Sequence, residues 1–233
     1  MKDKMKKNSI KKLIRYLIIL AVIPVVGAIG IFVFDNSKFM LFATAIAILS
    51  CVPFFMSFEK KETNTSRIVL LAVMTALSVG GRVVFSFFPF FKPITAIVII
   101  CGMYLGAEAG FMCGALSAFI SNFIFTQGPW TAFQMFAWGI IGFIAGLMHK
   151  AFKDSKFSLC TFGGISGFLY SFILDINSTL WLSGTFTFEA YLKITASSLP
   201  YTLIYAVSNV IFLLLLITPL GKKLDRVLTK FGI

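Results

Sequence analysis

Charged and amide side chains inside long apolar runs are the residues of this chain that could do chemistry. Arg82 and Asp175 are the two ionisable groups within such runs. A buried charge is costly in an apolar environment, so it marks either an ion pair that stabilises the fold or an anchor for a ligand. The sequence leaves both interpretations open for Arg82 and Asp175.

Two helix faces combine aromatic rings with buried amides. Their members are spaced at i, i+4 and i+8 and are Trp130, Gln134 and Trp138 on one helix and Tyr201, Tyr205 and Asn209 on another. Amides in an apolar environment need hydrogen-bonding partners. We predict one outward-facing cavity between these faces for a large planar or amide-bearing ligand. The alternatives are an interfacial aromatic belt and hydrogen bonds between helices.

The composition of the chain identifies the environment of these side chains. The 233 residues are 58% hydrophobic and 13% charged, and the mean hydropathy is +0.94. Soluble domains average about 45–50% apolar and about 25% charged residues, so a soluble domain, a disordered chain and a secreted disulfide scaffold are excluded. The net charge of +12 is scattered over short segments between apolar runs, which favours an integral membrane protein over a nucleic-acid-binding one.

Eight apolar runs predict transmembrane helices, each of which needs about 20 residues. They cover residues 13–34, 38–58, 66–87, 93–107, 109–126, 131–148, 159–181 and 197–218. The first run is too long for a signal peptide, so we expect it to be retained. The fourth and fifth runs would form a helix about 51 Å long if they were continuous. We therefore predict a tight hairpin with Glu108 at its tip and with Gly106 and Gly110 in the turn.

Basic residues are distributed unevenly between the two sides that this span count defines. With the N-terminus inside, 17 Lys and Arg residues fall on the cytoplasmic side, and Lys38, Lys92 and Lys193 fall outside. Because cytoplasmic segments are enriched in Lys and Arg, both termini are predicted to be cytoplasmic. The polar stretch EKKETNTS at residues 59–66 separates a two-helix N-terminal extension, residues 1–60, from a six-helix membrane domain, residues 61–233.

Motifs for catalysis and for metal binding are missing from the sequence. There is no P-loop. The GISG segment at residues 164–167 resembles part of an intramembrane protease motif, but the only histidine, His149, lies at a helix end among lysines. No disulfide or metal-ligand spacing relates the cysteines, which are Cys51, Cys101, Cys113 and Cys160. We predict no catalytic residue, no metal site and no cofactor.

Four segments resemble the substrate-binding component (S component) of energy-coupling factor (ECF) vitamin transporters. They are the small-xxx-small pair Ala72 and Ala76, PFFKPITAIVIICGMYLG (89–106), GALSAFISNFIFTQGPWTAFQMFAWGIIGFIAG (114–146) and LPYTLIYAVSNVIFLLLL (199–216). The run QGPWTAFQMFAWG is the most specific of these. The sequence looks closest to the branch assigned to cobalamin or a cobalamin precursor.

The resemblance implies an all-α integral protein of the cell membrane that captures a vitamin at the outer face. It would work with a membrane coupling subunit, which Ala72 and Ala76 would face, and with two cytoplasmic ATPase subunits. The outer loops 87–93, 126–131 and 178–196 would cover the ligand. S components usually have six helices, so the two N-terminal helices predicted here, which bring the total to eight spans, depart from the family pattern.

The residues expected to bind the substrate share polar or aromatic character and lie near the outer ends of the predicted helices. They are Arg82, Lys92, Gln127, Trp130, Gln134, Trp138, Asp175, Asn177, Tyr201, Tyr205 and Asn209. They would suit cobalamin, but also riboflavin, a pterin, queuosine or another flat heterocycle. A stand-alone secondary transporter is the alternative function, although Asp175 alone could couple ions. An intramembrane enzyme is the third function that the sequence leaves open.

Overall fold

The computed structural model of the chain describes residues 10, 13–32, 45–50, 52 and 65–232. Every regular element within these residues is helical. The elements are η1 (a π-helix, Ile18–Val22), α2 (Ile23–Phe32), α4 (Thr65–Val84), α5 (Ile94–Leu105), α6 (Ala107–Phe125), α7 (Pro129–Leu147), α8 (His149–Asp154), α9 (Lys156–Ser183) and α10 (Phe188–Phe231). The prediction of an all-α membrane protein is therefore confirmed.

Six stretches of the described chain are long and apolar enough to cross a membrane. They are Leu13–Gly30, Thr65–Val84, Ala107–Phe125, Pro129–Leu147, Lys156–Ser183 and Phe188–Phe231. The predicted second span, residues 38–58, lies mostly outside the described residues, and so does Cys51. Eight spans therefore remain a prediction.

Helix α5 differs from the span predicted for residues 93–107. It has 12 residues, or about 18 Å at 1.5 Å per residue, which is shorter than the hydrocarbon core of a bilayer. All of its residues except Tyr104 are buried, because α5 packs against α4, α6, α7 and α10. It is the central helix of the bundle.

The predicted hairpin between α5 and α6 is present. Gly106 is the only residue between the two helices and has a φ of +92°, a conformation that glycine adopts without strain. Glu108 lies in the first turn of α6. The prediction that Gly110 serves the turn is wrong, because Gly110 packs inside the bundle against the backbones of Gly102 and Gly142.

The predicted outer loop at residues 178–196 is also wrong. Helix α9 continues to Ser183, Gly184 ends it with a φ of +73°, and α10 already begins at Phe188. The serines and threonines that suggested a loop bond to their own helix instead. Ser178 Oγ donates to the Leu174 carbonyl at 3.2 Å, and Thr179 Oγ1 donates to the Asp175 carbonyl at 2.7 Å. Such bonds satisfy the hydroxyl groups within the helix, so the serines and threonines do not require a loop.

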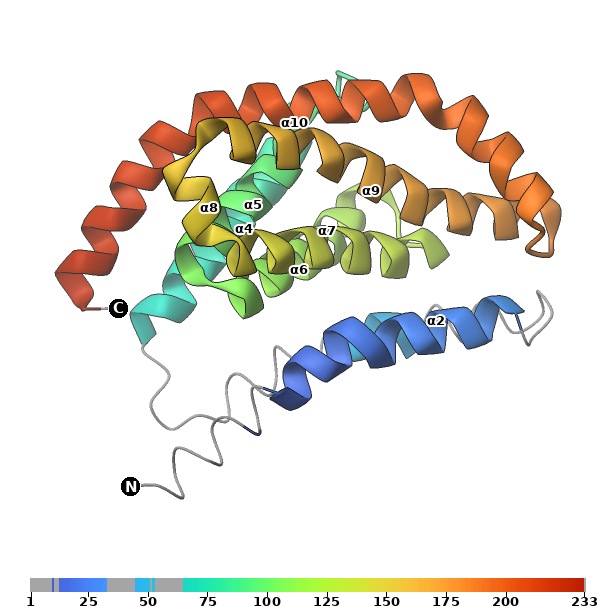
Figure 1. The fold of residues 1–233 in the computed structure, drawn as a ribbon, viewed down its shortest axis with the longest axis horizontal. Helices are drawn as coiled ribbons and strands as arrows, with labels where there is room; N and C mark the ends of the chain where they lie inside the picture. The colour runs from blue at the N-terminus through green and yellow to red at the C-terminus, as the bar shows by residue number, and fades with distance from the viewer. Residues whose placement is uncertain (1–9, 11–12, 33–44, 51, 53–64, 233) are drawn as a thin grey trace.

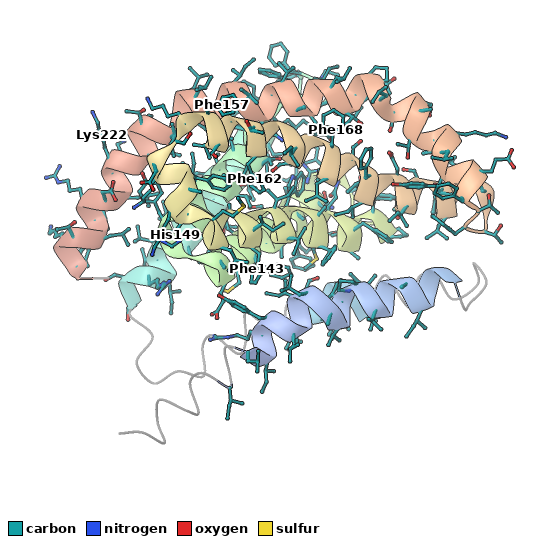
Figure 2. The ribbon with its side chains drawn as sticks, viewed as in Figure 1. Phe143, His149, Phe157, Phe162, Phe168 and Lys222 are labelled. Carbon is teal, nitrogen blue, oxygen red and sulfur yellow. The ribbon has the colours of Figure 1, made fainter. Side chains whose placement is uncertain are left out.

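The N-terminal helix contacts the bundle near the α5–α6 turn. Arg15 is 2% exposed, and its Nη1 lies 3.0 Å from Glu108 Oε2. The Tyr16 ring meets the Phe143 ring edge-on at 4.9 Å, and Figure 2 shows Phe143 on the side of the bundle that faces α2. Ile19 is fully buried. The extension therefore packs against the six-helix part through both an ion pair and apolar contacts.

We expect Glu108→Ala to destabilise the protein by about 3–5 kcal/mol, because it leaves the buried Arg15 guanidinium without its partner. Thermal unfolding of the purified protein in detergent measures the effect. Glu189→Ala is the control. The side chains of Glu189 and Lys193, which form an ion pair, are 79% and 74% exposed, so loss of this pair should change the free energy of unfolding by less than about 0.5 kcal/mol. Equal melting temperatures for the two variants would mean that the Arg15 contact does not stabilise the fold.

Candidate functional site

The two ends of the bundle differ in character. Figure 1 shows the C-terminus, the start of α4 and helix α8 at one end, and the α9–α10 turn at the other. We call the first the α8 end. The second, which also holds the α4–α5 connection (residues 85–93) and the α6–α7 connection (residues 126–128), we call the aromatic-loop end. His149 and Lys222 are labelled at the α8 end in Figure 2.

Five aromatic rings form a continuous row from the surface at the aromatic-loop end into the bundle. Tyr201 lies 4.5 Å from Phe90, Phe90 lies 5.5 Å from Tyr205, Tyr205 lies 5.0 Å from Tyr170, and Tyr170 stacks on Trp138 at 4.7 Å. The exposed fraction is 48% for Tyr201 and 2% for Trp138. We call these residues the aromatic row; they come from α7, α9, α10 and the α4–α5 connection.

Phe90 reaches the aromatic row through an unusual backbone conformation. Its φ is +62°, which is strained for a residue with a side chain. The next turn of the connection is fixed to α10, because the Lys92 N–H donates to Ser208 Oγ at 2.9 Å and Ser208 Oγ donates to the Lys92 carbonyl at 3.2 Å. The structure therefore holds an aromatic loop residue between the rings of Tyr201 and Tyr205.

Arg82 lies at the inner end of the aromatic row. Its side chain is 8% exposed, and its Nη1 donates to Ser121 Oγ and, at 2.8 Å, to Asn122 Oδ1. The guanidinium carbon is 5.1 Å from the centre of the Trp138 ring. The possible ion pair with Asp175 is not formed, since the Asp175 carboxylate accepts a hydrogen bond from Ser198 Oγ at 2.8 Å and no carboxylate of the described residues lies within 4 Å of Arg82.

Asn122 connects Arg82 to the predicted polar face of α7. Its Nδ2 donates at 2.8 Å both to Thr131 Oγ1 and to Gln134 Oε1. The Gln134 side chain also interacts with the Tyr170 hydroxyl, so the amide network and the aromatic row meet there. Asn122 was not among the predicted residues, although an amide within the apolar run 114–125 was a signal that could have identified it. Ser121 and Tyr170 were not predicted either, whereas Phe90 lies in the outer loop 87–93 that was expected to cover the ligand.

The remaining predicted residues lie in different surroundings. Gln127 Nε2 donates to the Phe119 carbonyl at 2.9 Å, and Trp130 Nε1 donates to the Thr126 carbonyl at 3.4 Å. Asn177 is buried, and its Oδ1 has no hydrogen-bonding partner among the residues that the structure describes. Asn209 Nδ2 donates to the Gly163 carbonyl at 3.2 Å, which joins α10 to α9. Asn209 and Gln134 thus both bond to a neighbouring helix, and the buried Asn209 Oδ1 has no partner among the described residues.

A second surface feature lies on the outside of the bundle. Ala72 and Ala76 are exposed on α4 and line an apolar groove of about 630 Å³ between α4 and α6. The groove walls include Ile68 and Val83 from α4 and Ile120 from α6. Two small side chains in its lining leave room for another helix to approach closely.

Comparison with known proteins assigns the family. A family model described as "ECF-type riboflavin transporter, S component" matches residues 62–226, well over half of the chain. No curated protein and no solved structure matches. The match covers α4 to α9 and most of α10, and the family is one of transporter components, not of enzymes. The predicted resemblance to S components is thus confirmed, while the cobalamin branch is not. The chain belongs to the family of S components of ECF-type riboflavin transporters.

Proposed function

We propose that the chain captures a flat heterocyclic vitamin at the aromatic-loop end and passes it to an ECF coupling module. The observation that supports this most directly is the aromatic row, which begins at the exposed Tyr201 and ends beside the network of Arg82, Asn122 and Gln134. Aromatic faces stack flat ligands, and amides fix their orientation. The row lies within the part of the chain that matches the family.

Riboflavin is the first candidate substrate, because the matched family is described by it. Two neighbouring pairs of rings in the row are inclined by only 33° (Phe90 and Tyr201) and 22° (Trp138 and Tyr170). The two pairs between them, which both include Tyr205, are inclined by 78° and 58°. A flat ring system that displaced Phe90 could stack in the same orientation. Cobalamin is the second candidate, because its many side-chain amides would suit the amides near this end.

The proposed orientation places the aromatic-loop end outside the cell. Basic side chains gather at the α8 end, as expected for a cytoplasmic side. Helix α8 carries Lys153, and the last turns of α10 carry Lys222, Lys223 and Arg226. The groove at Ala72 and Ala76 would receive the membrane coupling subunit. Two cytoplasmic ATPase subunits would supply the energy through that subunit.

We expect the purified protein to bind riboflavin in detergent without ATP, and Gln134→Ala to weaken this binding by about 5- to 150-fold. The reason is that loss of one buried hydrogen bond costs about 1–3 kcal/mol. Asn209→Ala is the matched control, since its amide bonds to Gly163; it should lower the melting temperature and leave the affinity within about twofold. Equilibrium binding and thermal unfolding measure the two effects.

The same experiment with cobalamin distinguishes the two candidate substrates. If the protein binds neither riboflavin nor cobalamin, mass spectrometry of the small molecules released from the purified protein identifies the vitamin that it does bind. Normal affinity in Gln134→Ala, with a lower melting temperature, would mean that both amides only join helices. The absence of any bound or released small molecule would contradict the proposed function.

A further inference from the structure

A polar cavity of about 420 Å³ lies at the α8 end of the bundle, and no residue predicted to bind the substrate lines it. Its wall includes Tyr16 from the N-terminal helix, Arg67 from the start of α4, Tyr104 from α5 and His149 from the start of α8. Figure 2 shows His149 at this end. Tyr16 lies outside the residues that match the family model, so the N-terminal extension completes the cavity.

The cavity wall can carry positive charge. Apart from two tyrosines, its ionisable side chains within the described residues are Arg67 and His149, and it holds no carboxylate there. Lys153 adds a cation beside the wall, because its Nζ lies 4.6 Å from the centre of the Tyr104 ring. An anion in the cavity would therefore face Arg67, Lys153 and, when its ring is protonated, His149.

The acidic residues at the α8 end do not cancel this charge. Glu108 pairs with Arg15 at 3.0 Å, and Asp225 lies 3.8 Å from Lys153. Asp154 ends α8 and does not line the cavity. Further basic residues follow in α8, at the start of α9 and in the last turns of α10; they are Lys150, Lys156, Lys222, Lys223, Arg226 and Lys230. The surroundings of the cavity are therefore positive.

Both cations of the wall keep hydrogen-bonding capacity for a ligand. Arg67 Nη2 donates to the Leu105 carbonyl, which holds the guanidinium over the α5–α6 turn, and its Nε and Nη1 have no partner among the described residues. His149 Nδ1 donates to the Gly146 carbonyl at 3.1 Å, so its Nε2 remains for a ligand. A guanidinium with two such donors matches the oxygens of a phosphate group.

The position of the cavity favours a lipid headgroup over a soluble phosphate. Arg67 and Leu147, which both line it, lie at the ends of stretches long enough to cross a membrane, where headgroups are found. Leu147 is 50% exposed, and Leu13 and Leu17 on the N-terminal helix are 60% and 51% exposed, so acyl chains could cover these side chains. Basic pockets between transmembrane helices on the cytoplasmic side suit anionic headgroups.

We propose that this cavity binds the headgroup of an anionic phospholipid, whose phosphate contacts Arg67 and His149 while its acyl chains lie along the exposed leucines. The site is separate from the aromatic row at the opposite end of the bundle, so the proposal does not depend on which vitamin the protein binds. It gives the N-terminal extension a role, since Tyr16 closes one side of the lipid site.

The test compares phosphatidylglycerol with phosphatidylcholine of the same acyl chains, which differ in the net charge of the headgroup. Native mass spectrometry of the full chain in a maltoside detergent counts the bound lipid as its concentration rises. We expect phosphatidylglycerol to bind at least about tenfold more tightly. Arg67→Gln and His149→Gln should each reduce this preference to less than about threefold. The ratio of two affinities in one variant does not depend on a general loss of stability.

Arg226→Gln is the matched control, because Arg226 is exposed at the same end but does not line the cavity; it should preserve the preference. Equal binding of the two lipids, or an equal loss of preference in Arg226→Gln, overturns the proposal, since the second result would mean that the overall charge attracts the lipid. Displacement of phosphatidylglycerol by millimolar inorganic phosphate also overturns it and assigns the cavity to a soluble anion. Equal binding of the lipids together with loss of vitamin uptake in Arg67→Gln would assign the cavity to the coupling subunit instead. None of these results alters riboflavin binding, which tests the proposed function separately and should stay within about twofold in Arg67→Gln.

Discussion

Ala72→Trp should reduce vitamin uptake to less than about a tenth of the wild-type rate while leaving substrate binding in detergent unchanged. Ala72 lines the apolar groove between α4 and α6, far along α4 from the proposed binding residues at the aromatic-loop end. An indole there would fill the space that, in the proposed function, a helix of the coupling subunit needs for close approach. Ala76→Trp, one turn further along α4, should act in the same way. Uptake is measured in cells that express the chain together with the coupling subunit and both ATPases.

Val73→Trp is the matched control for this effect. Val73 is 48% exposed on the same helix but does not line the groove, so its replacement adds the same indole to a different face. The control should transport at close to the wild-type rate. Normal transport by both alanine variants would place the coupling surface elsewhere on the protein. Loss of substrate binding in Ala72→Trp would show that the variant is misfolded rather than uncoupled.

The helices were predictable because their signals are local. A run of about 20 apolar residues is recognisable without knowledge of its neighbours, and the bounds predicted for α4, α6 and α7 lie within a few residues of those observed. The α5–α6 hairpin followed from length alone, since a continuous helix would have been too long. The bounds of α5 also lie within two residues of the predicted run 93–107, but α5 is enclosed by other helices, and the apolar pattern cannot distinguish such burial from contact with lipid.

The site was less predictable because its contacts join distant parts of the chain. The spacing of Trp130, Gln134 and Trp138 identified the face of α7, but the partner of Gln134 is Asn122 on another helix. Arg82 also bonds to Asn122, 40 residues away, instead of pairing with Asp175. A sequence shows which buried polar groups need partners, but tertiary packing decides which partners they receive. The threonines and serines before Gly184 suggested a loop because their bonds to carbonyls of their own helix leave no sequence signal.

Gly142→Ala should destabilise the protein by about 3 kcal/mol or more and lower its melting temperature by on the order of 10 °C. The α6–α7 contact is the most extensive between helices of the described chain, and the backbones touch at this position. A Cβ atom on Gly142 would lie 2.3 Å from the Gly110 carbonyl oxygen and 2.5 Å from its carbon. Backbone atoms cannot move aside as a flexible side chain can, so one methyl group must push two helices apart.

Gly80→Ala separates this packing effect from the general effect of removing a helical glycine. A Cβ atom on Gly80 would meet no atom of the described residues within 4 Å, and alanine favours a helix over glycine by about 0.5–1 kcal/mol. The control should therefore melt at or slightly above the wild-type temperature. The separation of α6 from α7 should also disturb Asn122 and Gln134, whose bond joins the same two helices, so Gly142→Ala should bind substrate more weakly as well. A Gly142→Ala protein as stable as the control would mean that the two helices tolerate a wider spacing than the structure gives them.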